Sequence, residues 1–284
     1  MAKPASLLLN ALGGATIAAT SAVTIGRIAF KRKVAREVAE LFEGSSARPN
    51  VVVDANIAGL PAPVQRWLRN AGVVGKERPA NVRLKQEGLF RQGEGQKWML
   101  FRAEEYYTTD PPGFIWSATM RVAPLLSIVG RDKYHGGRGS MQFRLLSLIP
   151  VANASGPELD QGALLRYLNE TMWFPAAALN PYITWESIDS NSAQATMRYQ
   201  GVQAAATFFF SDEGDLTNMV AQRYRLAPEG SVLDTWSTPL SEYGEFNGIR
   251  VPVAGEAVWN LASGDFSYIR LRVTEIEYDQ PTMY

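Results

Sequence analysis

The pattern of hydrophobic and polar positions changes its period along the chain. From about residue 81 onward, apolar and polar side chains alternate one by one, as they do in strands with one covered face and one wetter face. The clearest runs place apolar residues at every second position: Phe114, Trp116, Ala118, Met120 and Val122; Ala193, Ala195, Met197 and Tyr199; Ile269, Leu271 and Val273. Turn signals such as Asn247-Gly248 separate the runs. The pattern predicts about ten strands between residues 81 and 279.

One segment inside this region has helical spacing instead. Ser155 and Glu158 have the spacing of a capping box, with Pro157 in the first turn. An apolar stripe follows at Leu164, Leu165, Leu168 and Met172, and a proline ends it. Arg166 and Glu170 are four residues apart and are expected to pair along this helix, near residues 157–173.

Many strands, one helix and no alternation of strands with helices determine the expected fold class. The sequence predicts a mainly β (α+β) protein, in which a large antiparallel sheet curls into a half-barrel around one central helix. The chain is expected to divide into an N-terminal transmembrane anchor (1–30), a helical linker region (31–80) and the half-barrel domain (81–284). Within the linker region, helical spacing predicts helices over 34–42 and 62–71.

The anchor is predicted from the uncharged residues 5–26, about the ~20 residues that a bilayer core demands. A cleavable signal peptide and a buried helix of a soluble protein are the alternatives. Basic residues expected at the membrane interface follow the apolar run, namely Arg27, Lys31, Arg32 and Lys33. Their position favours the cytoplasmic face of a bacterial inner membrane, with the periplasmic face as the alternative.

Small residues recur at every fourth position of the same segment, at Gly14, Ala18, Ala22 and Gly26. Small side chains let the backbone of another helix approach closely, so other transmembrane helices are possible partners besides membrane lipids. The alternative is that alanine and glycine are simply common in such segments.

Composition removes several classes of function. The net charge is zero, with 28 basic and 28 acidic residues, which argues against nucleic acid as a partner. The chain has no cysteine and one histidine, His135, so thiolate chemistry and a multi-histidine metal site are excluded. We therefore predict no catalytic residue, no metal and no cofactor.

The charged segments are interpreted without a function. Neighbours on a strand point to opposite faces, so Glu104 and Glu105 cannot act together and are expected to be surface charges. Residues 131–139 pack charge and glycine into one stretch, which we interpret as a hairpin loop with solvated charges rather than a phosphate cradle.

Aromatic residues are the candidate ligand-binding positions. Six lie on segments that would border a concave face: Trp98, Tyr106, Trp116, Trp173, Phe174 and Trp185. They could line an apolar pocket for a lipid or a similar ligand. The alternative is that they fill the core, because aromatic residues dominate cores in general.

Three stretches resemble an uncharacterised bacterial family of membrane-tethered domains. They are residues 60–66 (LPAPVQR), 106–114 (YYTTDPPGF) and 154–162 (ASGPELDQG), and the resemblance covers nearly everything after residue 55. It implies no known activity.

A broader likeness is to the lipoprotein-carrier and lipoprotein-sorting half-barrels, carried by residues 243–252 (YGEFNGIRVP) and 274–278 (TEIEY). It implies a curved sheet with a helix in its mouth, often holding an acyl chain or a lipoprotein, and a periplasmic location.

These observations support three hypotheses. The favoured one is a non-enzymatic, membrane-tethered domain that binds a hydrophobic ligand or lipid at the membrane surface. The alternative is an accessory subunit that docks onto a membrane protein complex through its anchor helix and β domain. An enzyme that uses carboxylates and arginines ranks last, because no nucleophile–base pair or metal set is visible.

Overall fold

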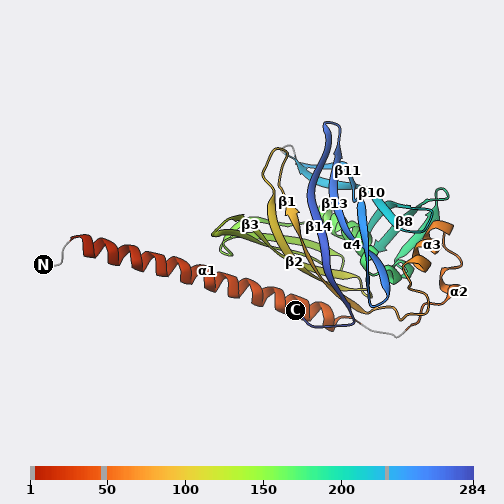
Figure 1. Ribbon diagram of the computed structural model, residues 1–284, viewed down its shortest axis with the longest axis horizontal. Helices are drawn as coiled ribbons and strands as arrows, with labels where there is room; N and C mark the ends of the chain where they lie inside the picture. Colours follow the sequence, from red (N-terminus) through yellow and green to blue (C-terminus); the bar gives the residue numbers. More distant parts are fainter. Residues whose placement is uncertain (1–3, 46–49, 228–229) are drawn as a thin grey trace.

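The computed structural model describes residues 4–45, 50–227 and 230–284, with side chains from residue 20 onward. Within these residues, fourteen strands form one sheet in which every pairing is antiparallel (Figure 1). The strands are β1 (Asn81–Phe90), β2 (Met99–Thr108), β3 (Gly113–Ala123), β4 (Leu126–His135), β5 (Arg138–Leu145), β6 (Ile149–Ser155), β7 (Ile183–Ser187), β8 (Ser192–Tyr199), β9 (Val202–Phe210), β10 (Leu216–Ala227), β11 (Gly230–Ser237), β12 (Leu240–Phe246), β13 (Ile249–Leu261) and β14 (Gly264–Tyr278). The expected ten strands were therefore too few.

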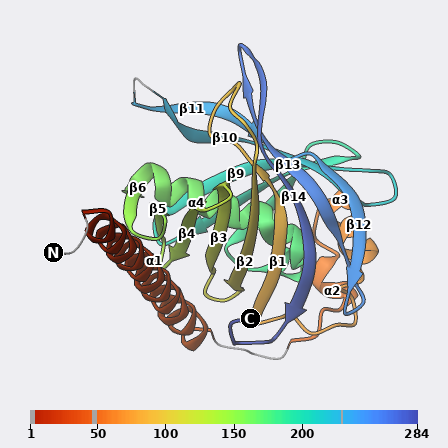
Figure 2. The same cartoon turned by 60° about the vertical axis from the view of Figure 1, so that its left-hand side comes forward.

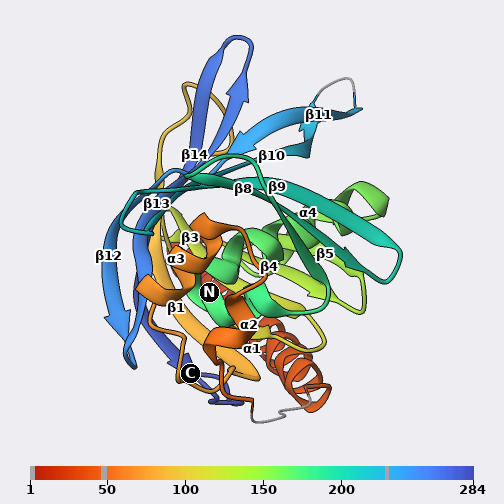
Figure 3. The same ribbon diagram turned by 90° about the vertical axis from the view of Figure 1, so that its right-hand side faces the viewer.

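The sheet is strongly curled, as predicted for a half-barrel (Figures 2 and 3). Its strand order is β6-β5-β4-β3-β2-β1-β14-β13-β11-β10-β9-β8-β7, and β12 pairs with β13 outside this path. Register shifts at Lys85/Gln86 and Ala257/Val258 mark irregularities that increase the local twist. Gly88 adds to the tight curvature, because a Cβ atom there would overlap the Arg270 carbonyl oxygen.

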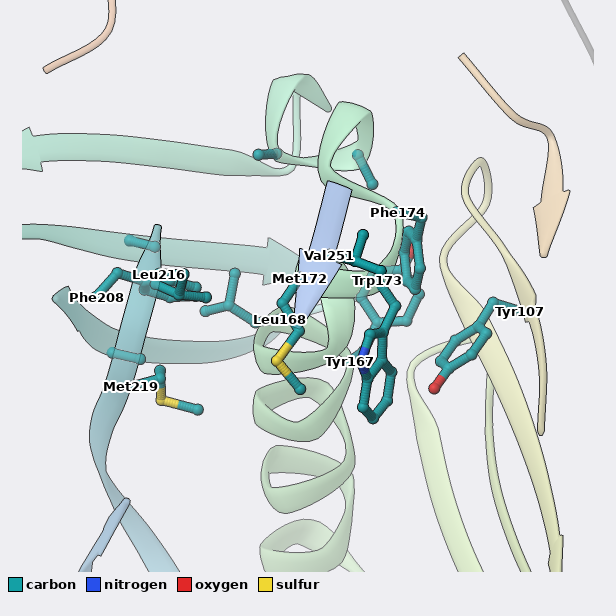
Figure 4. Packing of buried hydrophobic residues seen from close by; sticks show 14 of the residues in the cluster. Tyr107, Tyr167, Leu168, Met172, Trp173, Phe174, Phe208, Leu216, Met219 and Val251 are labelled. Carbon is teal, nitrogen blue, oxygen red and sulfur yellow. The ribbon is translucent and has the colours of Figure 1, made fainter. Parts of the chain in front are cut away.

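The concave face of the sheet holds the main core. The alternating residues Phe114, Trp116, Ala118 and Met120 of β3 are buried in it, as their period predicted, whereas Val122, the last of the predicted set, is exposed near the end of the strand. Helix α4 (Pro157–Glu170) and the short 3₁₀ helices η1 (Thr171–Trp173) and η2 (Pro175–Leu179) complete the core from inside the curl. Figure 4 shows Trp173 and Phe174 beside Tyr107 of β2, whose ring centroid lies 4.8 Å from that of Phe174.

Helix α4 begins at the predicted residue but is not central. It packs on β4–β6 near one edge of the sheet and on β8–β10 near the other, so it bridges the two ends of the half-barrel (Figure 3). The predicted capping box is also wrong. Gly156 is the N-cap, with a φ of 132°, and no side-chain hydrogen bond caps the helix.

Two further helices, α2 (Asp54–Ile57) and α3 (Ala62–Asn70), close one end of the half-barrel (Figure 3). Trp67 of α3 is 2% exposed and packs against Trp185, Phe208 and Phe210, with centroid distances of 6.2, 6.4 and 5.8 Å. Four hairpin turns lie at the strand ends that are farther from α2 and α3: β1–β2, β3–β4, β5–β6 and β13–β14. We call that side of the sheet the tip end.

Helix α1 (Pro4–Glu43) is one continuous helix whose C-terminal half packs on the convex face of β2, β3 and β4 (Figures 1 and 2). Its buried side chains are Phe30, Val34, Val38, Leu41 and Phe42, and the sheet contributes Tyr106, Ile115 and Val129. A nearly buried ion pair reinforces the contact, with Arg131 Nε 3.1 Å from Glu37 Oε2.

The transmembrane helix expected over residues 5–26 is not supported by the structure. Much of that segment, residues 5–19, lies outside the described side chains. In the part of the chain that is described, no helix is both long enough and apolar enough to cross a bilayer.

Candidate functional site

A cavity of about 570 Å³ lies between α4 and the concave face of the sheet. Its wall includes Met120 and Ile128, which flank the turn of the β3–β4 hairpin, and Phe90 at the end of β1. The cavity therefore lies toward the tip end, away from α2 and α3. Its volume falls within the range of about 300–1,000 Å³ that small-molecule sites occupy.

The wall of the cavity is mainly apolar and rich in aromatic side chains. The aromatic residues are Phe90, Phe101, Trp116, Phe143, Trp173, Tyr224, Trp236, Trp259 and Tyr268. They come from eight strands and from η1, so no single segment of sequence encodes the site. A ligand enclosed by such a wall gains free energy in proportion to the apolar surface that leaves water.

The polar part of the wall centres on Arg166 of α4. Its guanidinium group donates hydrogen bonds from Nη2 to Glu105 Oε1 (2.8 Å), from Nη1 to Asp132 Oδ2 (2.9 Å) and from Nε to Glu170 Oε1 (2.7 Å). The predicted Arg166–Glu170 pair is thus confirmed as one arm of a larger network.

The network continues through Glu105 into β1 and β3. Gln86 Nε2 donates to Glu105 Oε2 at 3.2 Å, and Gln86 Oε1 accepts a hydrogen bond from Trp116 Nε1 at 3.0 Å. Tyr107 also donates its hydroxyl proton to Glu170 Oε2 at 3.1 Å. The amide of Gln86 therefore orients a tryptophan of the cavity wall as well as a carboxyl group.

Three carboxyl groups share one guanidinium in this network, and burial is the largest influence on their pKa values. Burial raises the pKa of Glu105 well above its ordinary value, and the neighbouring Glu170 pushes it further, while Arg166 opposes both. Burial also raises the pKa of Glu170 and of Asp132, again against the attraction of Arg166. Arg131 and Arg223 also lower the pKa of Asp132, whereas Arg166 is the positive charge that acts on Glu105 and Glu170.

Replacing Glu105 with glutamine should change how stability depends on pH. Because the folded protein holds the Glu105 proton to a higher pH than the unfolded chain does, the wild type loses stability as pH rises from the ordinary pKa of 4.5 through the raised folded pKa. Glutamine has no such proton to lose. We expect the unfolding free energy of E105Q, relative to wild type, to increase with pH above that value in denaturant titrations.

The exposed carboxyl Glu94, in the β1–β2 loop, offers a control. E94Q should follow the wild-type profile. A difference between E105Q and wild type that stays constant with pH would contradict a raised pKa at Glu105.

The structure brings two of the six predicted ligand-binding residues together. Trp116 and Trp173 both line the cavity, and Trp173 Nε1 donates to the Pro252 carbonyl oxygen at 3.0 Å. Phe174 lies in the core beside them without lining the cavity. Tyr106 points to the convex face under α1, because neighbours on a strand face opposite sides.

The remaining two predicted residues lie elsewhere. Trp185 packs against α3 at the closed end of the half-barrel. Trp98, next to the start of β2, is half-buried beneath two arginines, with Arg91 and Arg270 4.5 and 5.0 Å from its ring centroid. The six residues therefore lie in at least three different environments.

The four predicted membrane-interface residues also lie in different environments. Arg27, Lys31 and Arg32 are exposed on α1, whereas Lys33 turns to the sheet and donates a hydrogen bond to Gln142 Oε1 at 2.9 Å. Of the predicted helix-packing residues, Gly14 and Ala18 lie outside the described side chains, and Ala22 is exposed. Gly26 faces this protein's own β5–β6 turn, since a Cβ atom there would come within 2.6 Å of Leu148 Cδ2.

The sequence analysis missed the buried charge network. Glu105 was expected at the surface, yet its side chain is fully buried. The strand period could have shown this, because Glu105 alternates in phase with Phe101, Ala103 and Tyr107, all of which face the core. Residues 131–139 were also misjudged, since Arg131 is buried and the turn itself consists of Gly136 and Gly137 between β4 and β5.

The ionisable residues of the described ranges form no cluster of three or more histidine, aspartate or glutamate side chains arranged to hold a metal ion. All three nitrogen atoms of Arg166 that carry protons are bonded to carboxylates. The network therefore places a guanidinium group whose donors are all used beside an apolar cavity, while Asp132 Oδ1 is buried without a hydrogen-bond partner among the described residues.

Together, the curled antiparallel sheet, the bridging helix and the mainly apolar cavity between them define a half-barrel protein. The chain belongs to the family of unknown function DUF6544, whose model matches residues 50–271. This match bears out the resemblance to an uncharacterised family, and it does not extend to the predicted anchor.

Comparison with solved structures gives low sequence identities. A DUF1329 family protein from Desulfovibrio piger is 11% identical, with a TM-score of 0.42, over 77% of this chain and 92% of that one. A LolA superfamily protein from Nitrosomonas europaea is 11% identical, with a TM-score of 0.39, over 76% of this chain and 94% of that one. Among curated proteins, none matches this chain.

Proposed function

We propose that this protein is a non-enzymatic binding protein that holds a hydrophobic ligand, such as the acyl chain of a lipid, between α4 and the concave face of the sheet. The observation that carries the proposal is the cavity of about 570 Å³ with its wall of aromatic and aliphatic side chains. A few fixed polar groups beside an apolar volume are typical of sites that bind small hydrophobic molecules.

The arrangement of the charges favours binding over catalysis. A general acid or base must reach the reacting atoms, and Glu105 is held by Arg166 and Gln86 behind the cavity wall. Asp132 and Glu170 do line the cavity, but both accept hydrogen bonds from Arg166. The same network ties α4 to β2 and β4, and so fixes the distance between the helix and the sheet across the cavity. The charges thus maintain the shape of the site.

A membrane tether, a cytoplasmic location and membrane lipids as partners remain predictions from the sequence. They agree with a hydrophobic ligand, because a bilayer is the main reservoir of such molecules. They rest on residues 5–26 and on the basic residues that follow.

Filling the cavity from α4 should weaken binding. Gly162 lines the cavity, and a Cβ atom at this position would have only Arg223 Nε within 4 Å, at 3.7 Å. A leucine side chain there would extend into the space that the ligand needs. We expect G162L to lower ligand occupancy about tenfold, since overpacking a filled site costs about 1–3 kcal/mol.

The measurement is native mass spectrometry of the full chain after extraction in a mild detergent. G162A is the matched control, because it adds one methyl group and leaves most of the cavity open. Both variants should keep or raise stability, since glycine in a helix costs up to about 1 kcal/mol relative to alanine. The proposed function is wrong if the wild type carries no hydrophobic ligand, or if G162L carries as much as G162A.

A further inference from the structure

Two hairpins at the tip end of the sheet expose large apolar side chains beside α1. Leu125, in the β3–β4 turn, is 94% exposed, and Ile149, at the start of β6, is 56% exposed. Leu148, in the adjoining β5–β6 turn, is also exposed. Apolar side chains gathered at loop tips are unfavourable in water and mark a surface that contacts a partner or a membrane.

Helix α1 leaves the sheet at the same place. Gly26 lies against Leu148, and Arg27 lines a groove together with Leu125, so α1 passes both hairpin tips at this point. Further toward the N-terminus the helix continues past the sheet (Figure 1), and Ile25 is 66% exposed there. Apolar positions of the helix and of the hairpin tips therefore lie on one side of the molecule.

The groove between α1 and the convex face is strongly basic. Among the described residues that line it, five arginines face one glutamate, Glu87: Arg27, Arg102, Arg121, Arg270 and Arg272. Arg102, Arg270 and Arg272 have carboxylate partners, at 3.8, 3.3 and 2.6 Å. Arg27 and Arg121 form no ion pair with any described residue, and both are exposed.

We propose that the tips of the β3–β4 and β5–β6 hairpins, together with the adjoining part of α1, dock on a bilayer surface that contains anionic phospholipids. In this arrangement Leu125, Leu148 and Ile149 enter the apolar boundary of the leaflet, while Arg27 and Arg121 meet the phosphate groups. Apolar side chains flanked by arginines are the combination that binds an anionic bilayer, because each part stabilises a different layer of the interface.

The docked orientation also gives the cavity access to the membrane. Met120 and Ile128 line the cavity from the hairpin that carries Leu125, and Val151 lines it from the strand that begins at Ile149. The proposal rests on the proposed function in one respect, namely that the docked leaflet is the source of the ligand.

The absence of cysteine allows the contact to be measured at single positions. L125C and I149C, each in the full chain, carry an environment-sensitive fluorophore and are mixed with vesicles of phosphatidylcholine, with or without phosphatidylglycerol. I188C is the matched control, because Ile188 is 54% exposed in the β7–β8 turn near α3, at the closed end. We expect the emission of L125C and I149C to rise severalfold on vesicles with phosphatidylglycerol, and that of I188C to stay unchanged.

The charge part of the proposal has its own variant. R27Q/R121Q should weaken binding to vesicles with phosphatidylglycerol by roughly tenfold, because two arginines near an anionic surface no longer contribute. The proposal is overturned if I188C responds as strongly as L125C, if R27Q/R121Q binds as the wild type does, or if only native membranes and no protein-free vesicles give a response. Ligand occupancy, measured on G162L and G162A, is a separate observable, so a failure of docking is distinguishable from a failure of the proposed function.

Discussion

Replacing Arg166 with methionine is expected to lower the free energy of unfolding by about 3–5 kcal/mol, the usual cost of removing one partner from a buried ion pair. Arg166 is the common donor to Glu105, Asp132 and Glu170, and its side chain is largely buried. Without the guanidinium group, Glu105 and Glu170 would remain buried with no opposite charge, whereas Asp132 would keep the attraction of Arg131 and Arg223. The two glutamates could only avoid this by taking up protons.

The loss in R166M should therefore be smaller at acid pH, where protonation of the carboxyl groups costs less. Denaturant titrations at several pH values measure it. Removing two carboxylates in the triple variant R166M/E105Q/E170Q should recover a large part of the loss.

R102M is the control, because the Arg102 side chain is 87% exposed, and its ion pair with Glu87 should contribute less than about 1 kcal/mol. Equal losses in R166M and R102M would show that the network does not stabilise the fold.

Trp67→Ala should cost a similar amount, about 3–5 kcal/mol, for a different reason. Trp67 is 2% exposed and lies between α3 and the aromatic residues Phe208 and Phe210. Its removal leaves a cavity that the surrounding strands can fill only in part. The same contact holds α3 over the closed end of the half-barrel, so the loss should also loosen that end.

Thermal or denaturant unfolding of W67A and W67F measures this effect, and W67F should lose clearly less because a ring remains. Trp98→Ala is the matched control, since Trp98 is half-buried at the tip end and packs against arginine side chains. A loss in W67A no larger than that in W98A would contradict the role given to α3. Hydrogen exchange in β8 and β9 should increase in W67A and stay unchanged in W98A.

The candidate site shows how far sequence reasoning reached. Trp116 and Trp173 were predicted as lining residues, and both do line the cavity. Tyr106, also predicted to line the pocket, does not line the cavity, because both faces of its strand are covered. Tyr107 faces the core, while Tyr106 is buried by α1. Ile115, which the alternation placed on the wetter face of β3, is fully buried for the same reason. The strand period assigns a residue to a face, and it does not say what covers that face.

The sequence by itself determined the features that depend on neighbouring residues. The period of two identified a mainly β chain and the inward set Phe114, Trp116, Ala118 and Met120, because alternation is a local property of an extended backbone. The helical spacing identified α4, and a separation of four residues identified the Arg166–Glu170 pair.

Only the tertiary structure decided the features that join distant segments. Glu105 and Arg166 are 61 residues apart in sequence, and whether Glu105 lies at a surface or in a buried ion network depends on how α4 places Arg166 beside β2. Likewise, Gly26 was predicted to pack against another helix from its spacing, and Lys33 was predicted at a membrane interface from its charge. Gly26 lies against this protein's own β5–β6 turn, and Lys33 donates a hydrogen bond to Gln142 of β5. The physical reason is common to both cases: burial is set by the whole arrangement of strands and helices, whereas periodicity reports only which residues share a face.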